Sequence, residues 1–491
     1  MLVAFVLLYL AVSVGIGLWA ARRVKNSKDF LVAGRSLPLF MSVTVVFATW
    51  FGAETVLAVS STFVKEGLRG IVADPFGFSM CLLFVGLFFA RAFYRMDLLT
   101  IGDFYRKRYG RPVELATSLA ITVSYLGWTS AQMAALGVVF HTVSGGAITM
   151  PAGIALGAGC VLVYTLFGGM WSVAFTDLFQ SVVIVLGLTY LAFLVADMAG
   201  GPGAVIAHAA TAEKLDFWPK LEARDMLAFF AAWLTAAVGS IPQQDIFQRV
   251  TAAKDEQTAV RGSIIGGALY FCFAFVPIFL GYSALLIDPQ MVAPLLASEG
   301  TEFQLILPKL ILERTPLFAQ VLFFGALLSA ILSTASGALL APTALFTENV
   351  LRALRPGMGD RQFLLTLRLV LVIFTLAVML FALESEATIY QMVQNTYKVT
   401  LVSCLVPLAA GIYWQRATAQ GALLSFALGL VTWTGMELFA ADSPWPAQLV
   451  GFAFALAGMW LGSIASPPPH LHQPTHHVPH SAAHHRPPRV R

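Results

Sequence analysis

Long apolar runs dominate this chain and predict a protein built from membrane-spanning helices. A span needs about 20 predominantly apolar residues, and by that measure the sequence predicts about thirteen. They lie at 2–21, 38–62, 71–93, 113–140, 150–169, 177–198, 225–247, 262–286, 316–346, 364–384, 388–412, 419–440 and 445–465. The pattern therefore predicts an all-α polytopic membrane protein.

The second predicted span is too polar for a continuous lipid-facing helix. It carries Thr49, Gly52, Glu54 and Thr55 close together. Irregular backbone at membrane depth is tolerated only where it lines a cavity. We therefore predict a broken helix around residues 48–53.

The ninth predicted span carries small residues at helical spacing. Ala330, Ser333, Thr334, Gly337 and Ala341 share one face of the run. A stripe of small side chains lets two backbones approach closely in a membrane. We expect this span to pack tightly against another helix.

Composition and charge agree with a membrane protein. Of the 491 residues 58% are hydrophobic and 11% are charged, and the mean hydropathy is +0.78, so the chain needs lipid around it. The basic residues cluster at 22–36, 92–112, 248–261, 347–363 and 413–418. The positive-inside rule then places the N-terminus outside and the C-terminus in the cytoplasm, with the chain in the plasma (inner) membrane. Basic clusters between spans do not predict nucleic-acid binding.

No motif for catalysis or a cofactor is present. HExxH, GxSxG and paired midplane carboxylates with a base are absent, so no enzyme and no cofactor is predicted. The four cysteines lie in apolar runs and are interpreted as buried small hydrophobes. Residues 466–491 hold seven of the nine histidines and are expected to be a disordered, His/Pro-rich cytoplasmic tail.

Five motifs, in order along the chain, resemble the sodium/solute symporter family. Residues 164–180 read YTLFGGMWSVAFTDLFQ, and residues 243–254 read QQDIFQRVTAAK. The others are GRSL at 34–37, the pair Ser333 and Thr334 leading to TEN at 347–349, and YWQRATAQGA at 413–422. The resemblance runs from about residue 2 to residue 462. WFG at 50–52, DPFG at 74–77 and GLFFA at 86–90 look most like the high-affinity choline transporter branch.

The resemblance implies the fold of the bacterial leucine transporter. That fold has two inverted repeats of five helices, here about 38–198 and 225–412, with broken helices at the membrane midplane. The transmembrane domain would occupy 1–465. The implied function is sodium-coupled uptake of a small organic solute by alternating access.

The resemblance also implies a sodium site. By motif position its ligands are the backbone oxygens of Ala48, Phe51 and Ala330 and the hydroxyls of Ser333 and Thr334. An alternative stays open, because Ser and Thr in spans often bond back to the i−4 carbonyl.

For the solute, Trp50 and Trp128 match aromatic positions that the choline branch uses against a quaternary ammonium. Gln243 stands where that branch has another Trp, and Glu54 where it has Gly, and these departures argue against choline itself. The expected solute is an organic cation or an amino-acid-like compound. Trp128 could instead be a packing residue. Glu54 could hold an ammonium group, bind a hydroxylated solute or carry a proton.

Two further charges suggest a gate or an ion path. Asp177 is either the N-cap of the sixth span or part of the cytoplasmic route for sodium. Lys398 lies about 15 Å into its span at helical rise, too deep to reach either surface easily. We expect it to contact Glu54, directly or through water, in a pair that closes the empty site. The alternatives are a permanent structural ion pair, or a Lys398 satisfied by carbonyls of its own span with Glu54 protonated.

Two alternative functions stay open. One is a proton-coupled transporter of the same fold, and the other is a transporter-like membrane sensor, although the tail leaves no room for a kinase domain. The expected partners are a small solute, sodium and the lipid bilayer. The oligomeric state is undetermined.

Overall fold

The protein is built from helices throughout the part that the structure describes. The structure is a computed structural model, and it describes residues 1–298, 302–355, 357–385 and 387–466. Within these ranges the extended pairing is a single bridge between Leu37 and Ala253. The all-α prediction is confirmed, whereas the predicted disorder of the tail concerns residues outside these ranges.

The long helices are α1 (Leu2–Ala20), α8 (Arg111–Val143), α9 (Met150–Met198), α13 (Glu256–Ile287), α16 (Leu317–Phe346), α18 (Asp360–Glu384), α21 (Ala419–Phe439) and α22 (Ala447–Ala465). Other spans are assembled from shorter pieces. These pieces are α3 (Leu39–Trp50), η3 (Glu54–Val59) and α4 (Ser60–Glu66); η4 (Leu68–Ile71), η5 (Val72–Gly77), α5 (Phe78–Phe84), η6 (Val85–Phe89) and α6 (Ala90–Arg95); α11 (Ala223–Gly239) and α12 (Gln244–Ala252); α19 (Ile389–Thr400), η9 (Leu401–Leu405) and α20 (Val406–Tyr413).

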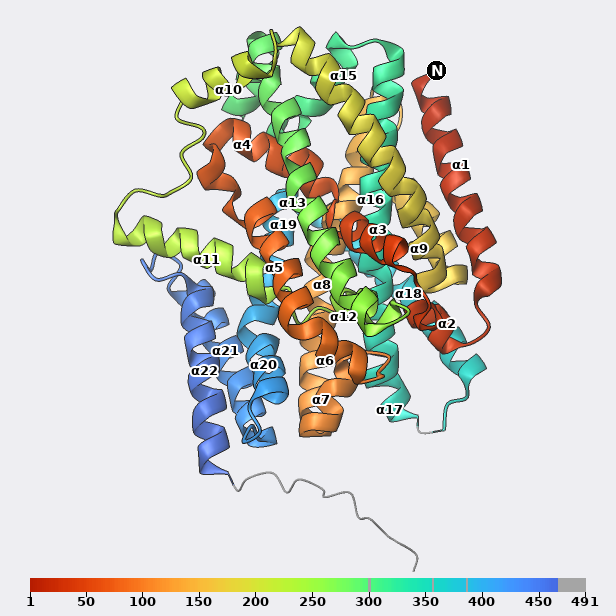
Figure 1. Cartoon of the computed structure of the whole chain (residues 1–491), viewed down its shortest axis with the longest axis vertical. Helices are drawn as coiled ribbons and strands as arrows, with labels where there is room; N and C mark the ends of the chain where they lie inside the picture. Colours follow the sequence, from red (N-terminus) through yellow and green to blue (C-terminus); the bar gives the residue numbers. More distant parts are fainter. Residues whose placement is uncertain (299–301, 356, 386, 467–491) are drawn as a thin grey trace, which may run out of the picture.

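Short helices connect the spans at the two ends of the molecule. Helices α2 (Ser27–Val32), α7 (Ile101–Tyr109) and α17 (Arg352–Leu354) lie in the lower half of Figure 1, and α10 (Pro202–Thr211) and α15 (Ile306–Arg314) lie near its upper end. The other short elements are η8 (Thr347–Leu351), α14 (Pro289–Ala297) and η7 (Glu302–Leu305). The N-terminus lies at the upper end, and α22 ends at the lower end (Figure 1).

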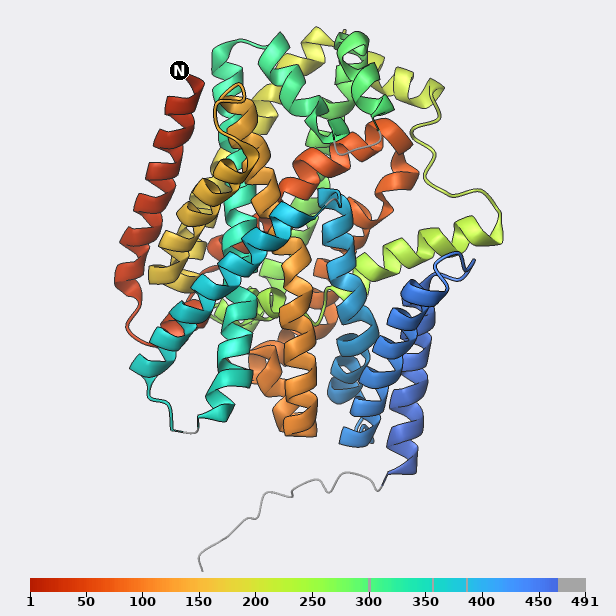
Figure 2. The ribbon, with the colours of Figure 1, turned by 180° about the vertical axis from the view of Figure 1, so that it is seen from behind.

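Helix α16 is the centre of the bundle. Every residue from 326 to 345 is buried, which requires a helix that is apolar or small on all sides. It packs against α8, α9 and α3. Helix α1 lies along α9 at one edge, and α21 and α22 pair at the opposite edge (Figures 1 and 2). The predicted tight packing of this span is therefore present.

Two spans are bent at a break. Helix α3 ends at Trp50 and the chain resumes at Glu54 with a bend of 54°, as predicted from the polar residues there. Helices α11 and α12 meet at a bend of 43° across residues 240–243. The second break was not predicted, although Pro242, which cannot donate a backbone hydrogen bond, marks it.

Several predicted boundaries need correction. Nine helices in the described residues are long and apolar enough to cross a membrane, and the two bent pairs raise this to eleven. The predicted spans 150–169 and 177–198 form one element, α9, kinked at Gly169. The count of thirteen stays a prediction. Cys81 and Cys404 are buried as expected, whereas Cys272 is exposed on α13.

The kink in α9 supplies a test of the fold. Gly169 has a φ of +49°, and a Cβ there would lie 2.4 Å from the backbone oxygen of Phe30 on α2. We predict that Gly169→Ala destabilises the protein by about 1–3 kcal/mol, because it adds backbone strain and a clash with main chain. Thermal unfolding of the purified protein in detergent measures the loss.

The matched control is Gly159→Ala on the same helix, where a Cβ meets nothing within 4 Å. It should leave the unfolding temperature unchanged or raise it slightly. Equal effects of the two substitutions would contradict the described kink.

Candidate functional site

The hydroxyls of Ser333 and Thr334 point away from their own helix. Ser333 donates to Asp177 Oδ1 at 2.6 Å, and Thr334 donates to the carbonyl oxygen of Ala48 at 3.4 Å. On the same helix Thr343 donates back to the i−4 carbonyl. The back-bonding alternative for the first two residues is therefore wrong, and their side chains link α16 to α9 and to α3.

The other predicted sodium ligands lie on the same segments. Phe51 leaves the helical conformation (φ −87°, ψ 76°), so the last carbonyls of α3 are not all used in a continuing helix. Ala330 lies one turn before Thr334 on α16 and is buried. The arrangement gathers hydroxyl and carbonyl oxygens around the end of α3, which suits a small hard cation.

Asp177 is not a helix N-cap. It lies inside the continuous second leg of α9, is fully buried, and accepts from Ser333. The N-cap prediction is wrong because the helix restarts right after Gly169 instead of at residue 177. A carboxylate beside the Ser333 hydroxyl fits the predicted place on an ion path.

Glu54 begins the second half of the broken helix and is held by two N–H donors from α8. Trp128 Nε1 donates to Oε1 at 3.1 Å, and Gln132 Nε2 donates to Oε2 at 2.7 Å. Gln132 Oε1 in turn accepts from the backbone N–H of Ala53 at 3.1 Å, which fixes the orientation of the amide. Glu54 is therefore bound as an acceptor at both oxygens.

Trp50 and Trp128 belong to one cluster of aromatic rings beside Glu54. Trp50 stacks on Tyr397 of α19, with ring centroids 6.0 Å apart and planes 9° apart. Trp128 lies 6.2 Å from each of these two rings, and Phe78 packs edge-on against Trp50. Because the rings touch one another, a solute can lie between them only after they separate.

Gln243 lies next to this cluster, in the second broken helix. It precedes α12, and its Nε2 donates to the hydroxyls of Ser124 and Thr400 at 3.3 and 3.4 Å. Ser124 is one turn before Trp128 on α8. The structure thus brings Trp50, Trp128, Glu54 and Gln243 together.

Lys398 does not contact Glu54. Its Nζ lies 3.3 Å from Glu437 Oε1 on α21, and Trp433 also donates to that oxygen. The side chain is 23% exposed and lines a hollow at the side of α11. The predicted contact is wrong because Lys398 faces outward from α19, toward the edge helices.

A buried arginine joins the two broken helices. Arg249 on α12 is 4% exposed. Its Nε donates to Thr49 Oγ1 at 3.0 Å, and its Nη1 donates to the carbonyl of Asp245 at 3.3 Å. A Cβ at Gly337 would lie 2.1 Å from its Nη2, so the guanidinium also fills the space left by that glycine of α16.

Arg35 belongs to the lower surface of the molecule. Its guanidinium is paired with the Asp97 carboxylate and lies over the Tyr94 ring. The hydrogen bond from Arg35 lowers the pKa of Asp97. The pair is a surface contact at the end of α6, away from the solute residues.

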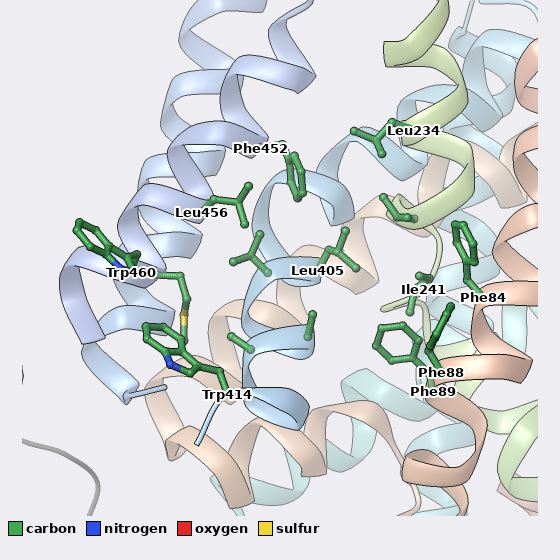
Figure 3. Close-up of a pocket in the computed structure, with 15 residues that line it drawn as sticks. Phe84, Phe88, Phe89, Leu234, Ile241, Leu405, Trp414, Phe452, Leu456 and Trp460 are labelled. Carbon is green, nitrogen blue, oxygen red and sulfur yellow. The ribbon is translucent and has the colours of Figure 1, made fainter. Parts of the chain in front are cut away.

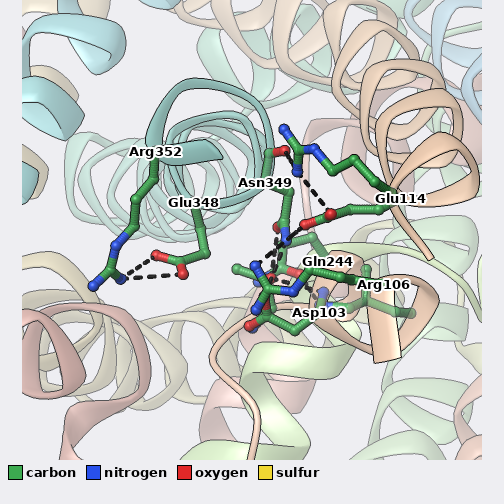
Figure 4. Close-up of polar contacts among 10 residues, drawn as sticks. Asp103, Arg106, Glu114, Gln244, Glu348, Asn349 and Arg352 are labelled. Carbon is green, nitrogen blue, oxygen red and sulfur yellow. Dashed lines mark hydrogen bonds and ion pairs between the residues drawn. The ribbon is translucent and has the colours of Figure 1, made fainter. Parts of the chain in front are cut away.

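A second polar cluster closes the lower end of the bundle (Figure 4). Asn349 Nδ2 donates to Asp103 at 3.0 Å and to Glu114 at 2.8 Å, and Thr100 donates to Asn349 Oδ1. The second broken helix also joins this cluster, because Gln244 at the start of α12 accepts a hydrogen bond from the Ile101 N–H at 2.8 Å. We call these residues the lower polar cluster; they tie α7, α8, η8 and α12 together.

A cavity of about 500 Å³ between α5, α11, α20 and α22 is a separate feature (Figure 3). Its walls are apolar, with Phe84, Phe88, Leu234 and Leu405 among them, and Phe88 is 55% exposed. A small polar solute needs convergent polar groups. The apolar lining of this crevice does not fit such a solute, so the crevice is not the candidate solute site.

Sequence reasoning missed several residues of the site. Gln132 follows Trp128 by one helical turn, a spacing that could have identified it. Tyr397 and Asp245 give no local signal, because their roles depend on helices distant in sequence. Thr347, Glu348 and Asn349 were noticed as a motif, and the structure now gives Asn349 its partners.

Comparison with known sequences gives a consistent result. Residues 30–429 match the model of the sodium:solute symporter family. The chain is 25% identical over 456 residues to high-affinity choline transporter 1 of Caenorhabditis elegans, covering 88% of this chain and 76% of that protein. It is 25% identical over 476 residues to the sodium/glucose cotransporter of Vibrio parahaemolyticus, covering 89% and 84%.

Solved structures share the fold. A Na⁺-coupled sialic acid symporter, in a substrate-bound outward-open state, aligns with a TM-score of 0.82 at 17% identity, covering 95% of this chain and 98% of that one. A nucleobase-cation-symport-1 family transporter in a closed conformation aligns with a TM-score of 0.59 at 15% identity, covering 90% and 97%. The predicted leucine-transporter fold is confirmed.

The bonds around Glu54 can be tested by exchanging two residues. Gln132→Glu alone would bury two carboxylates against each other, and we predict a loss of about 3–5 kcal/mol. Glu54→Gln alone would place the amide N–H₂ of the new Gln against an N–H donor from α8, and this unsatisfied contact should cost about 1–3 kcal/mol of stability. The double variant restores every bond, because Gln at 54 can accept from Trp128 and donate to Glu at 132, which accepts from Ala53.

Thermal unfolding of the four proteins forms a double-mutant cycle. The double variant should unfold within a few degrees of the parent and well above Gln132→Glu. Additive destabilisation by the two substitutions would contradict the contact between these side chains.

Proposed function

The chain belongs to the sodium:solute symporter family, and we propose that its solute is a small organic cation bound at Glu54 between the rings of Trp50, Trp128 and Tyr397. Its activity is sodium-coupled solute symport across a membrane, and it is a secondary transporter and not an enzyme. The cationic class of the solute and the residues that bind it are the parts that we propose.

The negative charge of Glu54 carries this proposal. Both oxygens of Glu54 accept from N–H groups, which cannot reverse their direction. No ion pair to Glu54 forms within the described ranges of the chain. An uncompensated charge at membrane depth costs about 2.5–3.5 kcal/mol or more. A cationic solute would remove that penalty on binding.

The aromatic rings support the same class of solute. A cation lying over a tryptophan face gains about 2 kcal/mol when water is excluded. Trp128, which donates to Glu54, contacts the rings of Trp50 and Tyr397. The relatives named as choline transporters handle a molecule of this class. The rings stack on one another when no cation separates them, so binding would exchange ring–ring contacts for ring–cation contacts.

Sodium would bind at the oxygens of Ala48, Phe51, Ala330, Ser333 and Thr334. Sodium there would hold the end of α3 against α16, and Gly52 lies between that site and Glu54: a Cβ at Gly52 would meet both Thr334 Oγ1 and Glu54 Oε2. The two sites thus share one short segment, which links their binding free energies reciprocally. Asp177 would offer the next oxygen for sodium leaving toward the lower end.

The basic segments support an orientation. Elements α2, α7, α17 and α20 lie in the lower half of Figure 1, and the basic residues Arg22, Arg23, Arg106, Arg352 and Arg416 belong to these elements or lie next to them in the sequence. We propose that this end faces the cytoplasm of a cell whose plasma (inner) membrane holds the protein. The solute would then enter from the upper end.

The sodium site predicts a graded response to loss of oxygen ligands. Ser333→Ala and Thr334→Ala should each raise the sodium concentration for half-maximal binding by about tenfold or more, since one lost hydrogen-bonding group beside a charge costs about 1.5–3 kcal/mol. Sodium-dependent thermal stabilisation of the purified protein measures this constant without knowledge of the solute.

The control is Thr343→Ala, which removes a hydroxyl that bonds only within α16. It should leave the sodium dependence unchanged. A sodium constant that is insensitive to both Ser333 and Thr334 would overturn the assignment.

The solute site predicts a ranking of probes and variants. Thermal-shift screening in sodium should identify cations such as choline or ethanolamine ahead of amino acids, monocarboxylates and sugars. For the cation identified, Trp50→Ala and Trp128→Ala should weaken binding by about 30-fold, and the Phe variants less, because a π face remains. Normal binding by both Ala variants, or stabilisation only by neutral sugars, would refute the proposed cation.

A further inference from the structure

A second buried carboxylate, Asp74, lies beside the broken helix but outside the sites already described. It interrupts the helix at η5 (φ −128°, ψ 120°) and is fully buried. Tyr270 of α13 donates to its Oδ1, and Thr55 donates to its Oδ2 at 3.1 Å. The Thr55 and Tyr270 hydroxyls are themselves 3.2 Å apart.

The partners of Asp74 differ from those of Glu54 in one chemical respect. A hydroxyl can donate or accept a hydrogen bond, whereas an indole or amide N–H can only donate. Thr55 and Tyr270 can therefore serve an ionised Asp74 by donating, and a protonated Asp74 by accepting. Trp128 and Gln132 can serve Glu54 well only as a carboxylate. The structure thus provides one fixed negative charge and one carboxyl that is satisfied in either state.

The groups around Asp74 are acids or neutral. From η3 Glu54 repels a negative charge on Asp74. The titratable groups facing it from other elements are Tyr270 on α13 and Tyr390 and Tyr397 on α19. Arg69 on η4 turns outward to Asp216 at 2.9 Å, and α11 carries charge only in its first turn, at Arg224 and Asp225. In the described parts of the chain no basic side chain forms an ion pair with Asp74.

A proton fits this place better than a metal ion does. The oxygens of Asp74, Thr55 and Tyr270 are within direct hydrogen-bond contact of one another, so there is no space among them for an ion. A proton needs only a lone pair on a carboxylate oxygen and a neighbouring hydroxyl that can rotate from donating to accepting a hydrogen bond.

We propose that Asp74 is a proton-binding site, and that a cation arriving at Glu54 drives this proton off. The first half stands on the contacts of Asp74 alone, and the second half rests on the proposed cationic solute. While Glu54 is not neutralised, its charge keeps the proton on the Asp74 carboxyl. When a cation neutralises Glu54, the O–H bond of Asp74 breaks and the proton passes to water, leaving the carboxylate to accept from Tyr270 and Thr55.

The route for the proton leads to the hollow at the side of α11. A hollow of about 450 Å³ is lined by Gly70, Val72 and Tyr390, and Val72 is two residues from Asp74. Tyr390 donates to the carbonyl of Gly70 at 3.2 Å across this hollow. Water entering this hollow would accept the proton from Asp74.

The proton site can be tested without any solute. Infrared difference spectra of the purified protein, recorded from about pH 5 to about pH 9, should contain a titrating carboxylic-acid carbonyl band, because perturbed carboxyls titrate in this range. The band should disappear in Asp74→Asn and persist in the control Asp225→Asn. Glu54→Gln should move its midpoint to lower pH, because the repelling charge is gone. A band that survives in Asp74→Asn, or its absence from the parent protein, would overturn the proposal.

The coupling is tested with choline as the probe cation in saturating sodium. Binding should release close to one proton, measured with a pH indicator in weak buffer, and the choline affinity should rise with pH by up to tenfold per unit. Asp74→Asn should bind choline with an affinity independent of pH and release no proton. Choline binding without proton release in the parent protein would refute the coupling and leave the cationic solute intact, whereas a failure of choline to bind would count against the proposed function and leave the infrared result to decide on Asp74.

Discussion

The interruption of α3 between Trp50 and Glu54 is the constraint on which the site depends. A continuous helix would use the Ala48 carbonyl and the Ala53 N–H within its own ladder. Here the carbonyl accepts from Thr334 on α16, and the N–H donates to Gln132 on α8. One short irregular segment therefore binds to two different helices of the bundle. Its two ends face different chemistry, oxygen ligands on one side and the Glu54 carboxylate on the other.

Burial of charge explains why the polar residues of the core are so closely connected. Glu54, Asp74, Asp177 and Asp245 are all buried, whereas Arg249 is the buried base placed among the broken helices in the described structure. Charges at membrane depth are stable only when each has partners. Asp177 and Asp245 lie near Arg249, while Glu54 and Asp74 are bonded only to neutral donors. The two acids left without a base are Glu54, at the proposed cation site, and Asp74, whose negative charge Glu54 repels. A cation at the first and a proton at the second would complete this core.

Much of the fold and part of the site could be predicted from the sequence, and the predictions that were missed or wrong have identifiable physical reasons. Apolar runs predicted the spans, and the polar residues at 48–55 predicted the first break, because both signals are local. The break at 240–243 was missed although Pro242 marks it. Lys398 was assigned to Glu54 because depth along a span says nothing about the direction in which a side chain points; its partner, Glu437, lies on an edge helix outside the repeats. The role of Gln132 depends on a contact across 78 positions of the chain.

The contacts at the two ends of the bundle suggest which must change during transport. At the lower end the polar cluster around Asn349 holds α7, α8, η8 and the start of α12 with at least four hydrogen bonds. Around Glu54 the closure consists of ring contacts among Trp50, Trp128 and Tyr397, together with the hydrogen bond from Trp128 to Glu54. Parting stacked rings costs about 0.5–1.5 kcal/mol per pair, whereas leaving buried polar groups without partners costs about 1–3 kcal/mol each. Opening the rings from the upper end is therefore the easier step, and release toward the lower end requires that Gln244 part from Ile101. Since Gln244 and Gln243 are neighbours, movement at the solute site and opening of the lower end act on the same break in the α11–α12 span.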